Sequence, residues 1–194
     1  MKAKVEEFSN IKMDCDYPNW SPNGEYIAFL GRHINSGATD YKLYVMSTKE
    51  MRYWVVSNIS TSPYRPTWSP DSQTIAFSSS DNRIFIINVN GNKNPELIIP
   101  FGGAPAWSPN GEYIVYRARY SVYLFNYKSK TEKKLIHNLG FSDIRDFVWS
   151  PDSPYIAFKT LTESNSPIKI IAPKSNATIS LKEYGNLRGL AWKY

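Results

Sequence analysis

WSPNGEYIAF, at residues 20–29, is the stretch of this sequence that decides its fold. It returns as WSPDSQTIAF from Trp68, WSPNGEYIVY from Trp107 and WSPDSPYIAF from Trp149, and its opening Trp returns once more as Trp192 in LAWKY. In each copy a short apolar segment ends in Trp, a Ser-Pro-(Asn/Asp)-(Gly/Ser) turn follows, and an apolar-aromatic run comes next. This pattern predicts strand, tight turn, strand, since Pro and Asn or Asp favour turn dihedrals and Gly accepts positive φ.

The carboxylates and amides of these four turns are interpreted as turn formers and not as catalytic groups. All four copies carry one, and a catalytic acid would not be needed four times. The residues concerned are Asn23, Asp71, Asn110 and Asp152.

The spacing of the repeated Trp residues predicts the architecture. Successive copies are 48, 39, 42 and 43 residues apart, and a period near forty with four strands per unit is typical of a β-propeller blade. The chain is rich in Tyr, Phe, Trp, Ile and Val and shows no long 3.6-residue periodicity, so we expect an all-β protein. We predict one β-propeller domain over residues 1–194, with four complete four-stranded blades at approximately 17–58, 64–100, 104–138 and 145–184.

Strand-like segments remain at both ends, at residues 4–8 and 187–194. They match only the fourth and the first strand of a blade, so they do not complete a fifth blade between them. Either the ring closes imperfectly, or this chain is a piece of a larger propeller, or two chains complete one another. We favour a fragment or an assembly, and the second case predicts a homo-oligomer that completes the ring.

Composition excludes several kinds of site. The single cysteine, Cys15, rules out an internal disulfide framework and multi-cysteine zinc patterns, and two histidines, His33 and His137, make a His-rich metal site improbable. We therefore expect no metal and no cofactor.

Charge and hydropathy bound the partners and the compartment. The net charge of +6 includes a lysine cluster at 128, 130, 133 and 134, interpreted as a solvated hairpin, which makes nucleic acid an improbable partner. No apolar run is long enough to span a membrane, and the start at Met1 lacks a signal peptide. The sequence leaves the compartment open: cytoplasmic if Met1 is native, periplasmic or extracellular if the N-terminus is trimmed.

The repeat resembles the TolB-like, or WD-repeat-like, β-propeller repeat, which reads approximately Pro-x-Trp-Ser-Pro-Asp-Gly-x-x-Ile-Ala-Phe. The resemblance covers residues 16–194; unit two has Ser72, and unit four Ser153, in place of Gly. It implies a propeller fold and leaves function open, because such repeats occur in periplasmic TolB-like proteins and beside the catalytic domains of prolyl-oligopeptidase-like enzymes. TolB-like proteins usually carry six blades and an N-terminal α/β domain, and neither is present here.

The first functional hypothesis is a non-catalytic scaffold that binds a protein or peptide through loops at one end of the ring. The residue four positions before each strand-ending Trp is expected at equivalent places on the channel rim, and Tyr and Arg are the residues that anchor interfaces. These positions suit an acidic or carboxylate-bearing peptide. These positions are Asp16, Tyr64, Gly103, Arg145 and Arg188. The predicted rim residues are Asp16, Tyr64, Arg65, Arg145 and Arg188, with Arg65 added as the neighbour of Tyr64; the predicted structural residues are Trp20, Trp68, Trp107, Trp149 and Trp192.

The second hypothesis is an accessory or substrate-gating propeller of a prolyl-oligopeptidase-like hydrolase, or a propeller lyase or glycosidase. The sequence contains no Gly-x-Ser-x-Gly nucleophile motif and no α/β pattern to hold one. We therefore predict no catalytic residue and do not expect independent catalysis.

Overall fold

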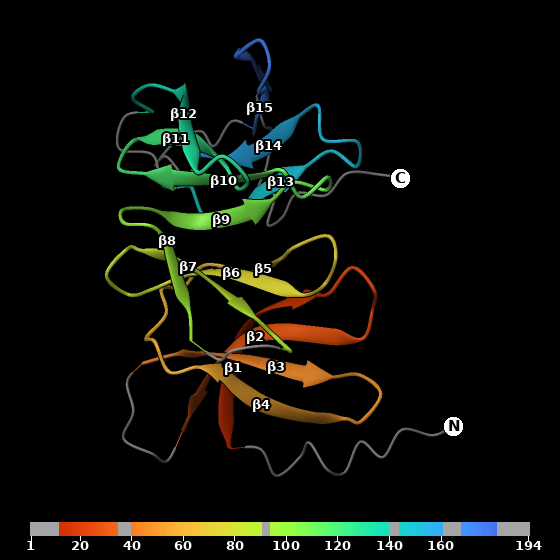
Figure 1. Ribbon diagram of the computed structural model, residues 1–194. Coiled ribbons are helices and arrows are strands. Elements are labelled where there is room, and N and C mark those ends of the chain that lie inside the picture. Colours follow the sequence, from red (N-terminus) through yellow and green to blue (C-terminus); the bar gives the residue numbers. More distant parts are fainter. Residues whose placement is uncertain (1–11, 35–39, 91–93, 140–143, 161–167, 182–194) are drawn as a thin grey trace.

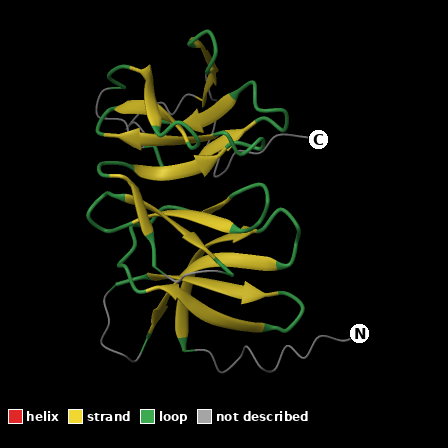
Figure 2. Cartoon of the chain, viewed as in Figure 1, coloured by secondary structure: helices red, strands yellow, loops and turns green. Residues whose placement is uncertain are grey.

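A computed structural model describes residues 12–34, 40–90, 94–139, 144–160 and 168–181. These residues form only strands, turns and loops, as Figure 2 shows. The strands make four antiparallel sheets of four strands each, and each sheet is built from consecutive strands of the chain. The protein is therefore an all-β propeller, and the sheets are blades 1 to 4 in chain order.

The strands of blade 1 are β1 (Met13–Trp20), β2 (Tyr26–His33), β3 (Lys42–Ser47) and β4 (Arg52–Ser57), and those of blade 2 are β5 (Thr67–Trp68), β6 (Thr74–Ser78), β7 (Ile84–Asn88) and β8 (Glu96–Ile99). Blade 3 contains β9 (Gly103–Trp107), β10 (Tyr113–Ala118), β11 (Ser121–Asn126) and β12 (Thr131–Ile136), and blade 4 contains β13 (Phe147–Trp149), β14 (Ile156–Lys159), β15 (Ile168–Ala172) and β16 (Ala177–Leu181). The predicted four complete blades are confirmed. The predicted end strands at 4–8 and 187–194, and with them Trp192, lie outside the described residues.

Three apolar cores join the blades in sequence order, one between each pair of neighbours. Figure 1 shows the sheets following one another from blade 1, in red and orange, to blade 4, in blue. Because every internal sheet is covered on both faces, its central strands are apolar on both sides. Strand β7 is the clearest case, since its first four residues, Ile-Phe-Ile-Ile, are all buried.

The turn after each repeated Trp is held by its serine. In blade 2 the Ser69 hydroxyl donates to Asp71 Oδ1 (2.5 Å) and accepts from the backbone N–H of Thr74 (3.0 Å). Gly24 and Gly111 both have φ of 72°, and Ser72 and Ser153 take similar values of 61° and 67° at the same turn position. The sequence Ser-Pro-(Asn/Asp)-(Gly/Ser) therefore forms one turn geometry four times.

Each buried repeat Trp packs on the blade before its own. The indole N–H of Trp68 donates to the carbonyl of Asn19 (3.1 Å), and that of Trp149 donates to the carbonyl of Ala106 (3.1 Å). Both acceptors immediately precede the repeat Trp of the previous blade. The indole N–H of Trp107 has no acceptor among the described residues; its backbone N–H donates to Thr67 Oγ1 instead (3.3 Å).

The expectation that all four repeat Trp residues are core residues is wrong for Trp20. Trp68, Trp107 and Trp149 are 4%, 7% and 8% exposed, whereas Trp20 is 59% exposed. The reason is its position: Trp20 belongs to blade 1, and no earlier blade lies before it in the part of the chain that the structure describes. The burial of this residue depends on a neighbour, not on its own repeat.

We predict that Trp149→Ala lowers the free energy of unfolding by about 3–5 kcal/mol, because it removes a buried indole and leaves a cavity between blades 3 and 4. Urea denaturation measures this change. Phe101→Ala is the matched control: Phe101 is 78% exposed, and its loss is expected to cost less than about 0.5 kcal/mol. Equal losses for the two variants would contradict the packing described here.

We predict that Asp71→Ala lowers stability by about 0.5–1.5 kcal/mol, because Asp71 Oδ1 accepts hydrogen bonds from Ser69 Oγ and from the backbone N–H of Gln73 (3.0 Å). Urea denaturation at neutral pH tests this effect. An unchanged midpoint would show that the carboxylate does not organise the turn.

Candidate functional site

The predicted rim residue Tyr64 lies inside the protein. Its side chain is only 9% exposed, and a Cβ atom added to Gly103 would lie 3.0 Å from its ring. The guanidinium of Arg117 stacks over the ring at 4.9 Å from its centroid and donates to the hydroxyl. The placement of Tyr64 on an exposed rim is therefore wrong: the ring locks blade 2 onto blade 3, and the glycine leaves room for it.

Arg65 forms a bridge across the inner strands. Its Nη1 atom lies 3.0 Å from Oδ2 of Asp146, so the segment before β5 is tied to the segment before β13 in blade 4. Burial raises the pKa of the Asp146 carboxyl, and the nearby Arg65 opposes that rise. The positive charge of Arg65 is therefore largely compensated within the protein by the Asp146 carboxylate.

Asp16 belongs to a separate cluster in blade 1. The hydroxyl of Tyr41 donates to Asp14 (2.7 Å) and to Asp16 (3.2 Å), and Arg32 pairs with Asp14 at 2.8 Å. The hydrogen bonds from Tyr41 and Arg32 hold the pKa of Asp14 below its usual value.

Four of the five predicted rim residues lie in the part of the chain that the structure describes. Arg145 is exposed beside the Asp146 bridge, and Arg188 lies outside the described residues. What the structure does assemble is the Tyr64–Arg117 contact and the Arg65–Asp146 bridge.

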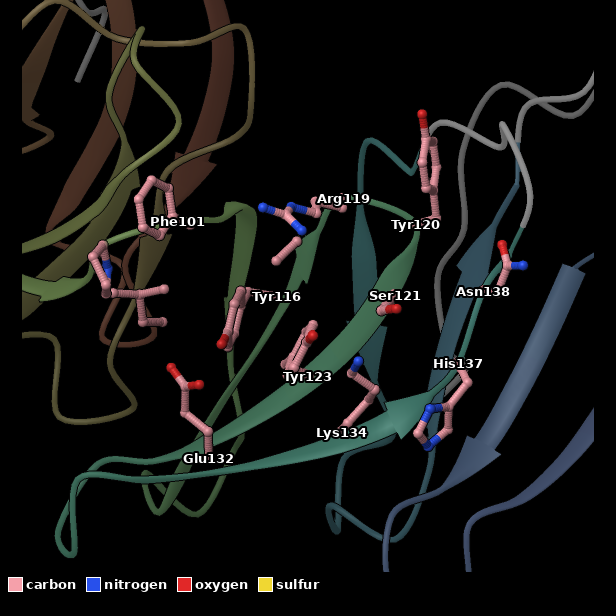
Figure 3. Close-up of a pocket in the computed structure, with 13 residues that line it drawn as sticks. Phe101, Tyr116, Arg119, Tyr120, Ser121, Tyr123, Glu132, Lys134, His137 and Asn138 are labelled. Atoms are coloured by element: carbon pink, nitrogen blue, oxygen red, sulfur yellow. The ribbon is translucent and has the colours of Figure 1, made fainter.

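A larger cavity opens between blades 2 and 3, where the outer strands of the two sheets diverge. Its volume is about 580 Å³. Figure 3 shows Phe101 at one wall and the side chains of strands β10, β11 and β12 at the other. The walls include Phe101, Tyr116, Arg119, Tyr123, Glu132 and Lys134.

The floor of this cavity is aromatic, and positively charged side chains outnumber negatively charged ones in its walls. Tyr116 and Tyr123 stack with centroids 5.4 Å apart, and the Lys134 ammonium lies 5.1 Å from the Tyr123 centroid. Burial, followed by a hydrogen bond to Glu132, raises the pKa of the Tyr116 phenol above its usual value. Glu132 is thus engaged by Tyr116, while Lys134 and Arg119 face the cavity as cations.

A second cavity, of about 370 Å³, continues from the first toward Asp81 of blade 2 and Gly103 at the start of β9. The walls of both include Phe101, Ala118 and Arg119, and we call the two together the blade 2–3 groove. Phe101 is 78% exposed at the junction. The acid at the far end, Asp81, is paired with Arg83, so positive charge predominates along the groove.

Arg119 occupies a backbone position that favours other residues. It is the first residue of a two-residue turn between β10 and β11, with φ of 52°. The hairpin between β6 and β7 of blade 2 places Asn82 at φ of 60°, and Asn or Gly is the usual residue in this region. An arginine at this φ carries a conformational cost that Gly or Asn would not. Sequence reasoning missed this signal, which is readable in Ala118-Arg119-Tyr120-Ser121 as a tight turn lacking Gly and Asn.

The described residues contain no group of three His, Cys, Asp or Glu side chains placed to hold a metal ion. Nor do they include a helix of the length and apolarity needed to cross a membrane.

The fold is that of the TolB-like β-propellers. TolB from Acinetobacter baumannii superimposes with a TM-score of 0.70 at 16% identity, over 87% of this chain and 43% of that one. A second TolB-like structure, from Agrobacterium tumefaciens, gives a TM-score of 0.70 at 11% identity, over 86% of this chain and 64% of that one. At such identities the likeness establishes the fold alone.

Sequence comparison finds a more limited match. The uncharacterised peptidase YuxL of Bacillus subtilis is 28% identical over 106 residues, which are 50% of this chain and 16% of that protein. No protein-family model matches the sequence. The chain thus spans less than two thirds of each of these relatives.

We predict that the Asp146 carboxyl makes the protein less stable as pH rises. Because its folded pKa is raised above the ordinary value of 3.8, its favourable contribution is present below that pH and is lost as pH rises through the folded pKa. The melting temperature of wild type relative to Asp146→Asn should therefore fall between acidic and neutral pH. A pH-independent difference between the two proteins would contradict the raised pKa.

Proposed function

We propose that this chain is a non-catalytic propeller scaffold that binds an acidic protein segment or peptide in the blade 2–3 groove. The observation that carries the proposal is the exposed pair of Phe101 and Arg119 at the shared wall of two open cavities. An exposed aromatic beside an arginine is the combination that anchors protein interfaces.

The charge of the groove selects the kind of partner. Asp81 is paired with Arg83, whereas Glu132 accepts a hydrogen bond from the neutral Tyr116 hydroxyl and keeps its negative charge. The two cations Lys134 and Arg119 outnumber Glu132, which leaves a positive balance over an aromatic floor. Carboxylates of a partner would form charge-assisted hydrogen bonds with these cations, and its apolar side chains would pack on Phe101 and Tyr123.

The groove is also wide enough and rigid enough for a peptide. Its larger cavity, of about 580 Å³, lies within the range of ligand pockets. Strands β10, β11 and β12 hold its floor in a paired sheet, so little ordering is needed when a partner binds.

Fluorescence polarisation with a labelled oligoglutamate peptide tests the proposal. We predict that Arg119→Gly weakens binding by about tenfold, equivalent to about 1.4 kcal/mol. Stability should be unchanged or slightly higher, because glycine accepts the positive φ of this turn. Added salt should weaken the wild-type complex, since its attraction is between solvent-accessible charges.

Lys128→Ala is the matched control, because Lys128 is an exposed lysine outside the walls of both cavities. It should leave the affinity unchanged. An oligolysine peptide that binds as well as oligoglutamate, or an Arg119→Gly variant with wild-type affinity, would refute the assignment.

The similarity to the peptidase YuxL supports a second candidate, an accessory propeller that gates substrate for a hydrolase. In that case a separately produced prolyl-oligopeptidase-type catalytic domain should bind this chain. Its cleavage of long substrates should then fall relative to short ones. Unchanged cleavage of both substrates would remove this alternative.

A further inference from the structure

A third cavity, of about 550 Å³, opens between blades 3 and 4, and described residues of both blades line it. Tyr113 and Leu124 of blade 3 and Trp149 of blade 4 supply its apolar wall, and charged side chains of both signs supply the rest. We call this space the blade 3–4 cavity. It lies on the other face of blade 3 from the blade 2–3 groove, so this inference does not rest on the proposed function.

The pairing registers show which side chain fills the equivalent space elsewhere in the protein. Across strands β2, β3 and β4 of blade 1 the paired positions are Ala28, Val45 and Trp54. Across strands β10, β11 and β12 of blade 3 the equivalent positions are Val115, Leu124 and Lys133. Blade 3 therefore has a lysine on its outer strand where blade 1 has a tryptophan.

In blade 1 the ring of Trp54 helps to close the interface with blade 2. It packs against the core that the two blades share and meets Tyr26 edge-on, with centroids 6.2 Å apart. Tyr26 in turn stacks on Trp68 of blade 2, with centroids 6.1 Å apart. Three aromatic rings thus fill the space between these two sheets.

Between blades 3 and 4 two of these three rings are kept and the third is missing. Tyr113 and Trp149 stand at the repeat positions of Tyr26 and Trp68, and both line the blade 3–4 cavity. Lys133 lines it too, and its Nζ donates to the carbonyl of Pro173 in blade 4 (2.9 Å). The cavity therefore lies where the first interface holds the indole of an outer strand.

The turns beside this cavity also lack a contact that the first interface has. Between blades 1 and 2 the backbone N–H of Asn23 donates to Ser72 Oγ (3.1 Å). The equivalent hydroxyl of blade 4, Ser153 Oγ, is buried and has no hydrogen-bond partner among the described residues. Ser153 lines the cavity, so a group that enters from outside can satisfy this hydroxyl.

The charges in the walls favour a neutral ligand that carries a hydrogen-bond donor. Carboxylates and ammonium groups line the cavity together: Glu112, Glu132 and Asp152 with Lys133 and Lys174. A cationic ligand would meet the lysines and an anionic ligand the carboxylates. Glu112 and Asp152 form no ion pair with a described residue, so they can accept a hydrogen bond from a neutral N–H.

We propose that the blade 3–4 cavity binds a Trp side chain of a partner protein, in the position that Trp54 occupies between blades 1 and 2. The indole packs on Tyr113 as Trp54 packs on Tyr26, and its N–H donates to a carboxylate of the wall. An indole is neutral, has apolar faces and carries one donor, which matches these walls. A tryptophan inserted into a pocket is a common anchor of protein interfaces.

Titration of the full chain with N-acetyl-tryptophanamide, followed by NMR, tests the proposal. We expect saturable shifts of the Tyr113 backbone N–H and of the Trp149 indole N–H at millimolar probe. N-acetyl-phenylalaninamide should bind about tenfold more weakly, because its ring lacks a donor for the carboxylates.

Lys133→Trp is the decisive variant, because it supplies the missing ring from within the chain. It should abolish the saturable shifts, and circular dichroism should stay unchanged, since blade 1 holds Trp54 at the equivalent position. Lys128→Trp is the matched control: Lys128 is an exposed lysine of the same blade outside the walls of this cavity, so its replacement should leave binding intact.

Three results would each overturn the proposal. The first is a wild-type chain that shows no saturable shift, and the second is a Lys133→Trp variant that binds the probe as the wild type does. The third is tighter binding of N-acetyl-argininamide or of glucose at the same signals, which would assign the cavity to a cation or to a sugar.

Discussion

The contact of each repeat Trp with the preceding blade is the constraint on which this structure depends. The indole rings of Trp68, Trp107 and Trp149 fill the cores between sheets, and the N–H groups of Trp68 and Trp149 also donate to the carbonyls of Asn19 and Ala106, just before the previous repeat Trp. One side chain therefore fixes both the spacing and the register of neighbouring blades. A hydrogen bond inside an apolar interface is directional, and burying the N–H without an acceptor would carry a desolvation cost. The number of residues between successive repeat Trp residues varies with the lengths of the other strands and of the loops; in the first repeat β2 has eight residues, against five in the equivalent β6.

The sequence predicted the strands closely because the information that defines them is local. Ser, Pro and Asn or Asp determine the turn, and the Ser69 and Asp71 hydrogen bonds show that these side chains close it themselves. The exposure of Trp20 could not be predicted in the same way. Its repeat is identical in pattern to the others, and burial of a repeat Trp is a property of the blade that lies before it. The local sequence therefore determines where the strands and turns form, whereas the preceding blade determines whether the repeat Trp is buried.

The site was less predictable for a related reason. Equivalent positions in a repeat need not have equivalent roles. Among the residues four positions before each repeat Trp, Tyr64 is buried against Gly103, whereas Asp16 accepts a hydrogen bond from Tyr41 in blade 1. The Arg65–Asp146 ion pair joins segments far apart in the chain, so no local sequence pattern could have predicted it. The groove itself arises where two sheets diverge, so its walls come from loops and strands of different blades. Only Arg119, in a turn that prefers Gly or Asn, left a trace in the sequence.

Propeller geometry also explains why a groove opens between blades 2 and 3. Innermost strands of adjacent blades pack closely, but the sheets spread apart toward their outer strands, and the gap must be filled by large side chains or remain open. Between blades 2 and 3 the stacked Tyr116 and Tyr123 fill part of it, and the remaining volume has Lys134 and Arg119 at its edge. Charges are tolerated there because water reaches them. The exposed edge of the groove can therefore carry charge that the closely packed inner strands could not.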